Sequence, residues 1–165
     1  MNYFLLFVTL ALIFIWYLTF SANRLDRLHH RVETSWANLD SILQRRAAIA
    51  QEIGHLAETD PATNLLLMGA SHAARDADIA ERSQAESGLS QALRLLRNES
   101  DFPKLHPELF GELEAVNERI RLAVALHQES VRATLNRRGK IIYRVFRLAG
   151  SAPLPVTYPF EDDLL

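Results

Sequence analysis

Hydrophobic and polar positions divide the chain into an unbroken apolar start and a periodic remainder. Residues 3–20 read YFLLFVTLALIFIWYLTF and contain no charged residue, glycine or proline. From Leu25 onward, apolar residues recur mostly in steps of three and four, the spacing of one face of an α-helix. Only six glycines and six prolines occur, which argues against a many-turned β fold. The pattern therefore predicts an all-α protein.

The apolar start has the length of a membrane span. A helix from Tyr3 to Phe20 extends ~27 Å, close to the ~30 Å hydrocarbon core of a bilayer. A cleaved signal peptide is the alternative, but it needs a positively charged start and a small residue where Phe20 stands. We therefore interpret residues 1–22 as a retained transmembrane anchor that contacts the lipid bilayer through Tyr3 to Phe20.

Positive charge flanks the span on one side only. Arg24, Arg27 and Arg31 follow it closely, whereas the N-terminal side carries only the α-amino group. Because positively charged flanks tend to stay in the cytoplasm, we expect a single-pass protein of the cell membrane. Its N-terminus is expected outside and its following domain in the cytoplasm.

Three amphipathic helices are predicted in a domain of residues 23–149. The first continues from the anchor without a breaker, the second runs from about Ala62 to Arg97 after the cap Asp60-Pro61, and the third starts near Pro107. Residues 98–107 are expected to form a loop. The apolar face of the second helix is expected to comprise Leu65, Met68, Ala73, Ala77, Ala80, Leu89, Leu93 and Leu96.

Such helices bury their apolar faces in an antiparallel bundle of three to four long helices with left-handed coiled-coil packing. A break of the third helix at Gly139 would supply a short fourth helix. A parallel homo-oligomeric coiled coil is the alternative, but two breaks that permit hairpins favour the bundle. Residues 150–165 contain three prolines and an acidic end, and are expected to be an extended or disordered tail.

Composition gives no sign of catalysis or of nucleic-acid binding. The net charge is −2 and the chain contains no cysteine. Glu52-x-x-His55 is the single Glu-x-x-His match, whereas a di-iron bundle needs this motif on each of two helices. Neither a phosphate-binding loop nor a nucleophile elbow occurs. We expect no metal, no cofactor, no nucleic-acid partner and no enzymatic activity.

Arg46 interrupts the apolar stripe of the first helix. A charged side chain on this stripe would be buried between helices and would need a partner of opposite charge. Leaving one member of a buried pair alone costs ~3–5 kcal/mol. We expect an interhelical polar network that includes Arg46 with Asp40, Arg45, Arg75 and Glu118. Solvated ion pairs are the simpler interpretation for Arg45 and Arg75.

Two ring-bearing residues also lie on the apolar stripes. Trp36 is interpreted as a core anchor, with recognition of a partner in a groove as the alternative. His127 is interpreted as a hydrogen-bonded core histidine rather than a metal ligand.

The third helix carries a run of basic residues near its end: Arg132, Arg137, Arg138, Lys140, Arg144 and Arg147. In a three-helix layout this helix leads away from the membrane, which places the run ~50 Å from the bilayer. The acidic residues 161–163 or an acidic partner are then expected to contact the run, and the loop at Phe102 is expected to lie near lipid.

Several short motifs follow one another along the chain: Asn23-Arg24-Leu25, Val32-Glu33, Ser35-Trp36-Ala37-Asn38-Leu39-Asp40, Leu43-Gln44-Arg45-Arg46, Ala74-Arg75, Phe102-Pro103-Lys104-Leu105, Phe110, Leu113, Glu118, Phe146-Arg147-Leu148-Ala149-Gly150, Ala152-Pro153 and Tyr158-Pro159-Phe160-Glu161. These motifs resemble those of the LemA family, including its actinobacterial-type members. The chain departs from the family at Ile49-Ala50-Gln51-Glu52, where Leu-Ile-Pro-Asn is usual. It also departs at His127-Gln128 and Thr134-Leu135, where Tyr-Asn pairs are common.

The resemblance implies a single-pass membrane protein with a soluble four-helix bundle and no established catalytic activity. We therefore expect a noncatalytic interaction or scaffold module with a protein partner. A ligand-sensing or enzymatic bundle is the alternative, and homo-oligomerisation is left open. The candidate interaction or interhelical polar residues are Trp36, Asn38, Asp40, Arg45, Arg46, Arg75 and Glu118.

Overall fold

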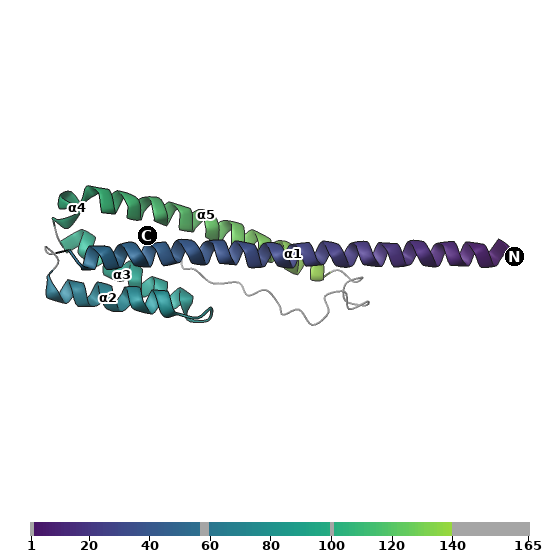
Figure 1. The fold of residues 1–165 in the computed structure, drawn as a ribbon, viewed down its shortest axis with the longest axis horizontal. Helices are drawn as coiled ribbons and strands as arrows, with labels where there is room; N and C mark the ends of the chain where they lie inside the picture. The colour runs from purple at the N-terminus through teal and green to yellow at the C-terminus, as the bar shows by residue number, and fades with distance from the viewer. Residues whose placement is uncertain (1, 57–59, 100, 140–165) are drawn as a thin grey trace. The chain divides into compact units, whose positions relative to one another are not determined.

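The computed structural model describes residues 2–56, 60–99 and 101–139. Helices make up nearly all of these ranges, and no strand occurs within them. The helices are α1 Asn2–Gly54, α2 Pro61–Asp76, α3 Arg82–Glu99, α4 Phe102–Leu105 and α5 Pro107–Arg138 (Figure 1). The prediction of an all-α helical bundle is confirmed.

α1 is a single helix of 53 residues, so the apolar start continues into the domain without a break, as predicted. Apart from the half-buried Leu18, its large apolar side chains between Tyr3 and Phe20 are exposed, and Trp16, for example, is 69% exposed. Within the described ranges, α1 is the one helix long and apolar enough to cross a membrane, although a signal sequence meets the same criterion. The exposure excludes these side chains from the protein's own core.

The described chain forms two compact units, which α1 and α5 both pass through. The first unit holds α1 up to Ser35 and α5 from His127. The second unit, residues 36–126, holds the rest of α1 and α5 together with α2, α3 and α4.

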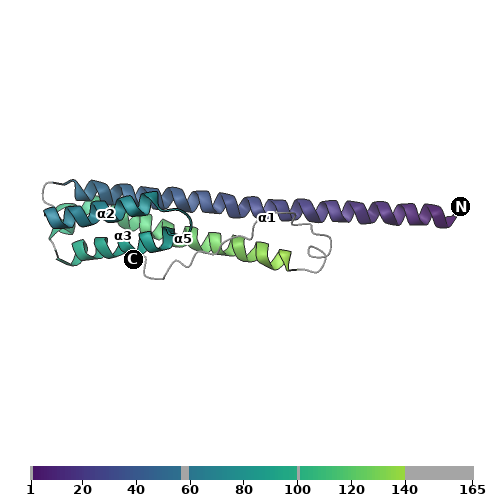
Figure 2. The same ribbon diagram turned by 90° about the horizontal axis from the view of Figure 1, so that it is seen from below.

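In the second unit, α2 and α3 form a helical hairpin beside the C-terminal half of α1 (Figures 1 and 2). The Gln44 side-chain amide donates to the carbonyl of Arg75, and the Asn64 amide donates to the carbonyl of Gly54. These two contacts show that α2 runs antiparallel to α1, so the chain returns after the Asp60-Pro61 break. Asp60 caps α2 through the N–H groups of its first turn and Pro61 opens the helix, as predicted.

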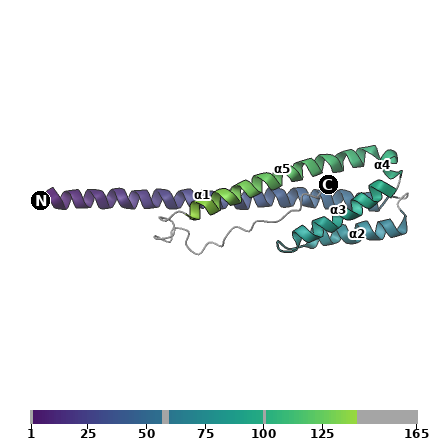
Figure 3. The ribbon, with the colours of Figure 1, turned by 180° about the vertical axis from the view of Figure 1, so that it is seen from behind.

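The remaining helices complete a four-helix bundle in this unit. α3 runs in the direction of α1, because α1 residues 40 and 46 contact residues 82 and 86 in the same order. α4 reverses the chain again and leads into α5 (Figure 3). In α5, Glu112 pairs with Arg45 of α1, and Glu114 lies 3.9 Å from Arg97 of α3. The predicted 98–107 loop therefore contains a short helix, and the next helix starts at Pro107 as expected.

The core of the bundle is built from one face of each long helix. The stripes predicted for the first and third helices supply much of it, because removing a leucine or isoleucine side chain from water contributes ~1.5–3 kcal/mol. The buried members of these stripes are Leu39, Leu43, Ile49, Ile53, Leu113, Val116, Ile120 and Ala123.

The prediction of one helix from about Ala62 to Arg97 is wrong. The chain leaves the helix after Asp76 and starts a new one at Arg82, so the fourth helix of the bundle comes from this break. Asp78 causes the new start: its Oδ1 accepts the N–H groups of Ala80 and Glu81 at 2.9 and 3.0 Å. These are N–H groups that a helix start leaves without an intrahelical acceptor.

The buried face of α2 also differs from the predicted one. Leu67, Ser71 and Ala74 are buried, whereas Leu65 is 76% exposed and Ala73 is exposed. Residues 65–67 are three consecutive leucines, so apolar periodicity alone does not decide which of them faces the core. The small side chains of Ser71 and Ala74 follow Leu67 at steps of four and three, which lets the backbone of α2 approach its neighbours.

In the first unit, α5 runs antiparallel to α1. The Ser35 hydroxyl lies 2.9 Å from His127 Nδ1, and the Thr134 hydroxyl lies 3.4 Å from the carbonyl of Leu28. The two pairs are seven residues apart on each helix and run in opposite order. His127 is 2% exposed and hydrogen-bonded, as expected of a core histidine.

This antiparallel direction overturns the expected layout of the basic run. Because the second helix splits, the next long helix returns toward the start of α1 instead of leading away from it. Arg132, Arg137 and Arg138 belong to this returning part of α5. The other basic residues of the run, the tail of residues 150–165 and any break after Gly139 lie outside the described residues.

We predict that Asp78→Ala lowers the free energy of unfolding by about 1 kcal/mol, because it removes the N-cap of α3. Asp76→Ala is the matched control: this exposed carboxylate lies in the last turn of α2, where a negative charge is slightly unfavourable. Thermal unfolding followed by circular dichroism measures both. Equal losses in the two variants would contradict a capping role for Asp78.

Candidate functional site

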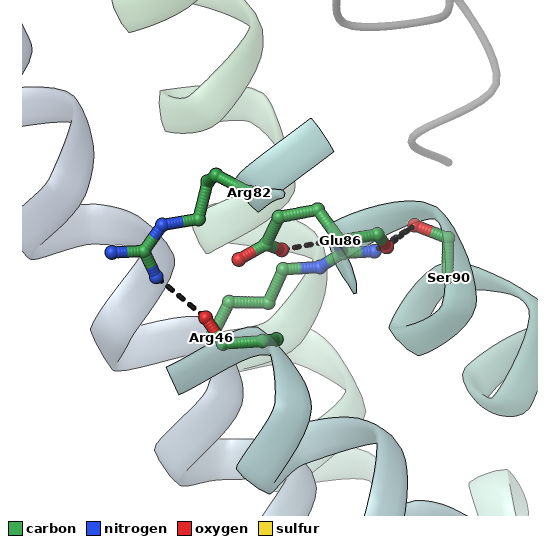
Figure 4. A network of polar contacts seen from close by, with 5 residues as sticks. Arg46, Arg82, Glu86 and Ser90 are labelled. Carbon is green, nitrogen blue, oxygen red and sulfur yellow. Dashed lines mark hydrogen bonds and ion pairs between the residues drawn. The ribbon is translucent and has the colours of Figure 1, made fainter. Parts of the chain in front are cut away.

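A buried ion pair joins α1 and α3 in the centre of the bundle. Arg46 Nη1 donates to Glu86 Oε2 at 3.1 Å, and Arg46 Nη2 donates to the hydroxyl of Ser90 at 2.7 Å (Figure 4). Arg46 and Glu86 are 1% and 0% exposed. Arg46 lies on the apolar stripe of α1 and requires a partner of opposite charge. That partner is Glu86 on α3.

A second arginine lies on the other side of Glu86 (Figure 4). Arg82, the first residue of α3, is buried and forms an ion pair with Asp40 on α1. Its guanidinium also donates to the carbonyl of Ala74 near the end of α2. Arg82 thus holds the α2–α3 turn against α1, and Asp40 is the α1 residue that receives it.

Burial dominates the electrostatics of the central pair. It raises the pKa of the Glu86 carboxyl to about 7, although the attraction of Arg46 opposes this rise. Burial also lowers the pKa of Arg46, against the pull of Glu86. Glu86 Oε1 has no hydrogen-bond partner among the described residues, which adds to the cost of its charged form. Desolvation therefore exceeds the attraction between the two groups, as is common for buried ion pairs.

A cleft of about 160 Å³ lies beside Arg46 in the second unit. Leu93, Phe110 and Leu113 supply apolar surface to it. Its polar lining residues are Arg46, Ser90, Arg94, Arg97, Glu114, Asn117, Glu118 and Arg121. The cleft therefore combines an apolar surface with charged groups of both signs, which is a lining suited to binding rather than to a recognisable reaction.

The structure brings only some of the predicted polar residues together. Arg46 and Glu118 both line the cleft, but the carboxylate of Glu118 pairs within α5, with Arg121 at 2.6 Å. Arg45 pairs with Glu112 of α5 at the surface, and this hydrogen bond raises the pKa of Arg45.

The other candidates lie apart from the cleft. Arg75 is exposed and contributes its carbonyl, not its side chain, to the contact with α1. Trp36 is half-buried and packs against the core, and Asn38 is exposed.

Sequence reasoning missed Arg82, Glu86 and Ser90, which complete the network. A signal was present: the three residues recur in steps of four and therefore share one face of α3. The spacing Asp78-x-x-Glu81 just before them is typical of a capping box, which would have placed the start of α3.

Neither a cluster of metal-ligating side chains among the described residues nor a known relative identifies the function of the site. Among residues 2–56, 60–99 and 101–139, no group of three or more histidines, aspartates and glutamates lies close enough to hold a metal ion. Comparison with known proteins gives no match to a protein-family model, to a curated protein or to a solved structure. The resemblance to the LemA family therefore rests on the motifs in the sequence.

We predict unequal costs for removing the two partners of the central pair. Glu86→Leu should lower the free energy of unfolding by about 3–5 kcal/mol, because it leaves a buried guanidinium that does not deprotonate. Arg46→Met should cost less, because Glu86 is left able to take up a proton. The double variant should be close to wild type. Thermal unfolding of all four proteins forms a double-mutant cycle, and a double variant as unstable as Glu86→Leu would contradict this account.

The raised pKa of Glu86 also predicts a pH dependence of stability. The folded chain holds the Glu86 proton up to about pH 7, whereas the unfolded chain releases it near 4.5. The free energy of unfolding should therefore fall as the pH rises through this window, by up to about 3 kcal/mol, and then level off. Glu86→Gln is the control, because it removes the titrating group. If wild type and Glu86→Gln show the same pH dependence, Glu86 does not titrate in this range.

Proposed function

We propose that this chain is a membrane-anchored, noncatalytic interaction module of the LemA type. The observation that carries the proposal is α1 itself, whose first residues expose an apolar surface while its last residues build the core of a bundle. A long row of exposed aromatic and aliphatic side chains is stable in lipid but not in water. The motifs described above supply the family assignment.

The anchor is proposed to be retained, with the bundle in the cytoplasm. Phe20, which stands where a cleavage site needs a small residue, supports retention over cleavage. The arginines at 24, 27 and 31 support the orientation.

The proposed binding surface is the cleft beside Arg46. Apolar contact area next to arginines is typical of protein–protein hot spots, and Phe110, Leu93 and Arg97 provide this combination. The central ion pair lies next to the cleft and holds α1 against α3, which lines one side of it. A protein partner with both an apolar and an acidic group fits this surface. The same cleft would suit a small ligand in the alternative, ligand-sensing function.

We predict that the full chain stays in the membrane fraction after an alkaline wash and keeps the mass of the uncleaved sequence. In-cell crosslinking followed by mass spectrometry should then capture a partner with wild type, and Arg97→Glu should lose it. Arg97 is 65% exposed in its side chain, and its contact with Glu114 is a 3.9 Å surface pair of little energy, so the fold should persist.

The matched control is Arg119→Glu, an exposed position on α5 outside the cleft. A partner lost in both variants would place the binding surface elsewhere. A shortened mass would show that the apolar start is a cleaved signal sequence, and the anchor would then be wrong.

A further inference from the structure

The first unit brings two arginine-bearing segments to the same level, directly after the apolar stretch. The pairs Ser35–His127 and Leu28–Thr134 fix an antiparallel register without slip over seven residues. Continued by four more residues on each helix, this register places Arg138 opposite Arg24. Arg24 is itself four residues beyond Phe20, which corresponds to ~6 Å along the helix axis.

The charge at this end of the unit is predominantly positive. On α1, Arg24, Arg27 and Arg31 are exposed and spaced three and four residues apart, so they share one face of the helix. Asp26 is the acidic residue at the same level, while Glu33 lies further along α1.

On α5 the positive charge comes from Arg132, Arg137 and Arg138. Glu129 faces Arg132 at 3.8 Å, and both of their side chains are more than two thirds exposed. Arg137 and Arg138 are half-buried and lie at the end of α5. The two helices together therefore form a basic collar, residues 24–31 of α1 with residues 132–138 of α5.

We propose that this basic collar binds the phosphate groups of anionic lipids in the leaflet next to the bundle. The inference rests on the proposed membrane anchor, because the anchor fixes the collar at the height of the headgroups. Arginine suits this role, since its planar guanidinium forms paired hydrogen bonds with phosphate oxygens. A cluster of basic residues immediately after a transmembrane helix is also the pattern associated with anionic headgroups.

The position of the collar favours lipid over other acidic partners. A protein partner would have to reach a surface within ~6 Å of the end of the span, where headgroups already supply phosphate. The α5 arginines come from a segment more than one hundred residues from the span in sequence, so they act as an independent test of the placement. They can be changed without altering the charges that orient the anchor.

The experiment uses the full chain in a neutral detergent with equal amounts of phosphatidylglycerol and phosphatidylcholine. Native mass spectrometry then compares the two lipids retained by the protein. We expect wild type to prefer phosphatidylglycerol, and this preference should decline as salt is raised. Each arginine near a membrane surface changes lipid affinity roughly fivefold, so Arg137→Gln with Arg138→Gln should weaken phosphatidylglycerol retention by about 25-fold.

Two matched variants control this measurement. Arg75→Gln with Arg119→Gln removes the same charge from exposed positions in the second unit and should leave the preference intact. Arg137→Lys with Arg138→Lys keeps the charge and should restore most of it. If the glutamine variant loses helix content, the salt dependence of wild type decides the question instead.

Flotation of the full chain with phosphatidylcholine vesicles separates failure of this inference from failure of the anchor. If the chain does not float with them, the anchor and the proposed function are wrong. If it floats but retains the two lipids equally at low salt, the collar does not bind anionic lipid. The same conclusion follows if the Arg137→Gln, Arg138→Gln variant and the Arg75→Gln, Arg119→Gln control retain phosphatidylglycerol equally. It also follows if the Arg137→Gln, Arg138→Gln variant loses a crosslinked acidic protein while its lipid retention is unchanged.

Discussion

The cost of burying charge governs the bundle in residues 36–126. Arg46 lies where the stripe of α1 would otherwise be apolar, and its guanidinium stays charged even though burial lowers its pKa. This buried charge is tolerated because Glu86 and Ser90 both accept hydrogen bonds from Arg46. These contacts fix both the rotation and the axial position of α3 against α1. Arg82 repeats this constraint one turn earlier with Asp40. The Arg46–Glu86 pair therefore specifies an arrangement of helices more than it stabilises it, because desolvation offsets its attraction.

The turn at residues 77–81 has consequences well beyond its size. It converts one expected helix into a hairpin, and this added reversal changes the direction of every element that follows. α5 consequently returns along α1, and its arginines reach the level of those that follow the apolar stretch. A layout with one helix fewer would place the same arginines at the opposite end. The cap at Asp78 is thus a local interaction that decides where distant residues lie.

Much of this architecture could be read from the sequence, and the failures have physical causes. The absence of a helix breaker after the apolar stretch correctly predicted a continuous α1, and the Asp60-Pro61 pair correctly predicted the start of α2. The break at Asp78 was missed because an alanine-rich segment keeps helical propensity on both sides of it, and the cap is the sole local signal. The face of α2 could not be chosen among residues 65–67, since three consecutive leucines carry no period. Arg46 could be recognised as a charge needing a partner, but which acidic residue meets it depends on the α3 register, a tertiary property.

The contacts Ser35–His127 and Leu28–Thr134 repeat at an interval of one heptad, so a shift of α5 by seven residues is the nearest alternative that preserves coiled-coil packing. Such a shift would break both polar contacts and move the end of α5 by ~10 Å along the helix axis. That distance is about one Debye length at moderate salt, so in the membrane placement proposed above it would remove Arg138 from the field of the headgroups. Two small polar side chains and one imidazole thus set the axial position of an arginine that is distant in sequence.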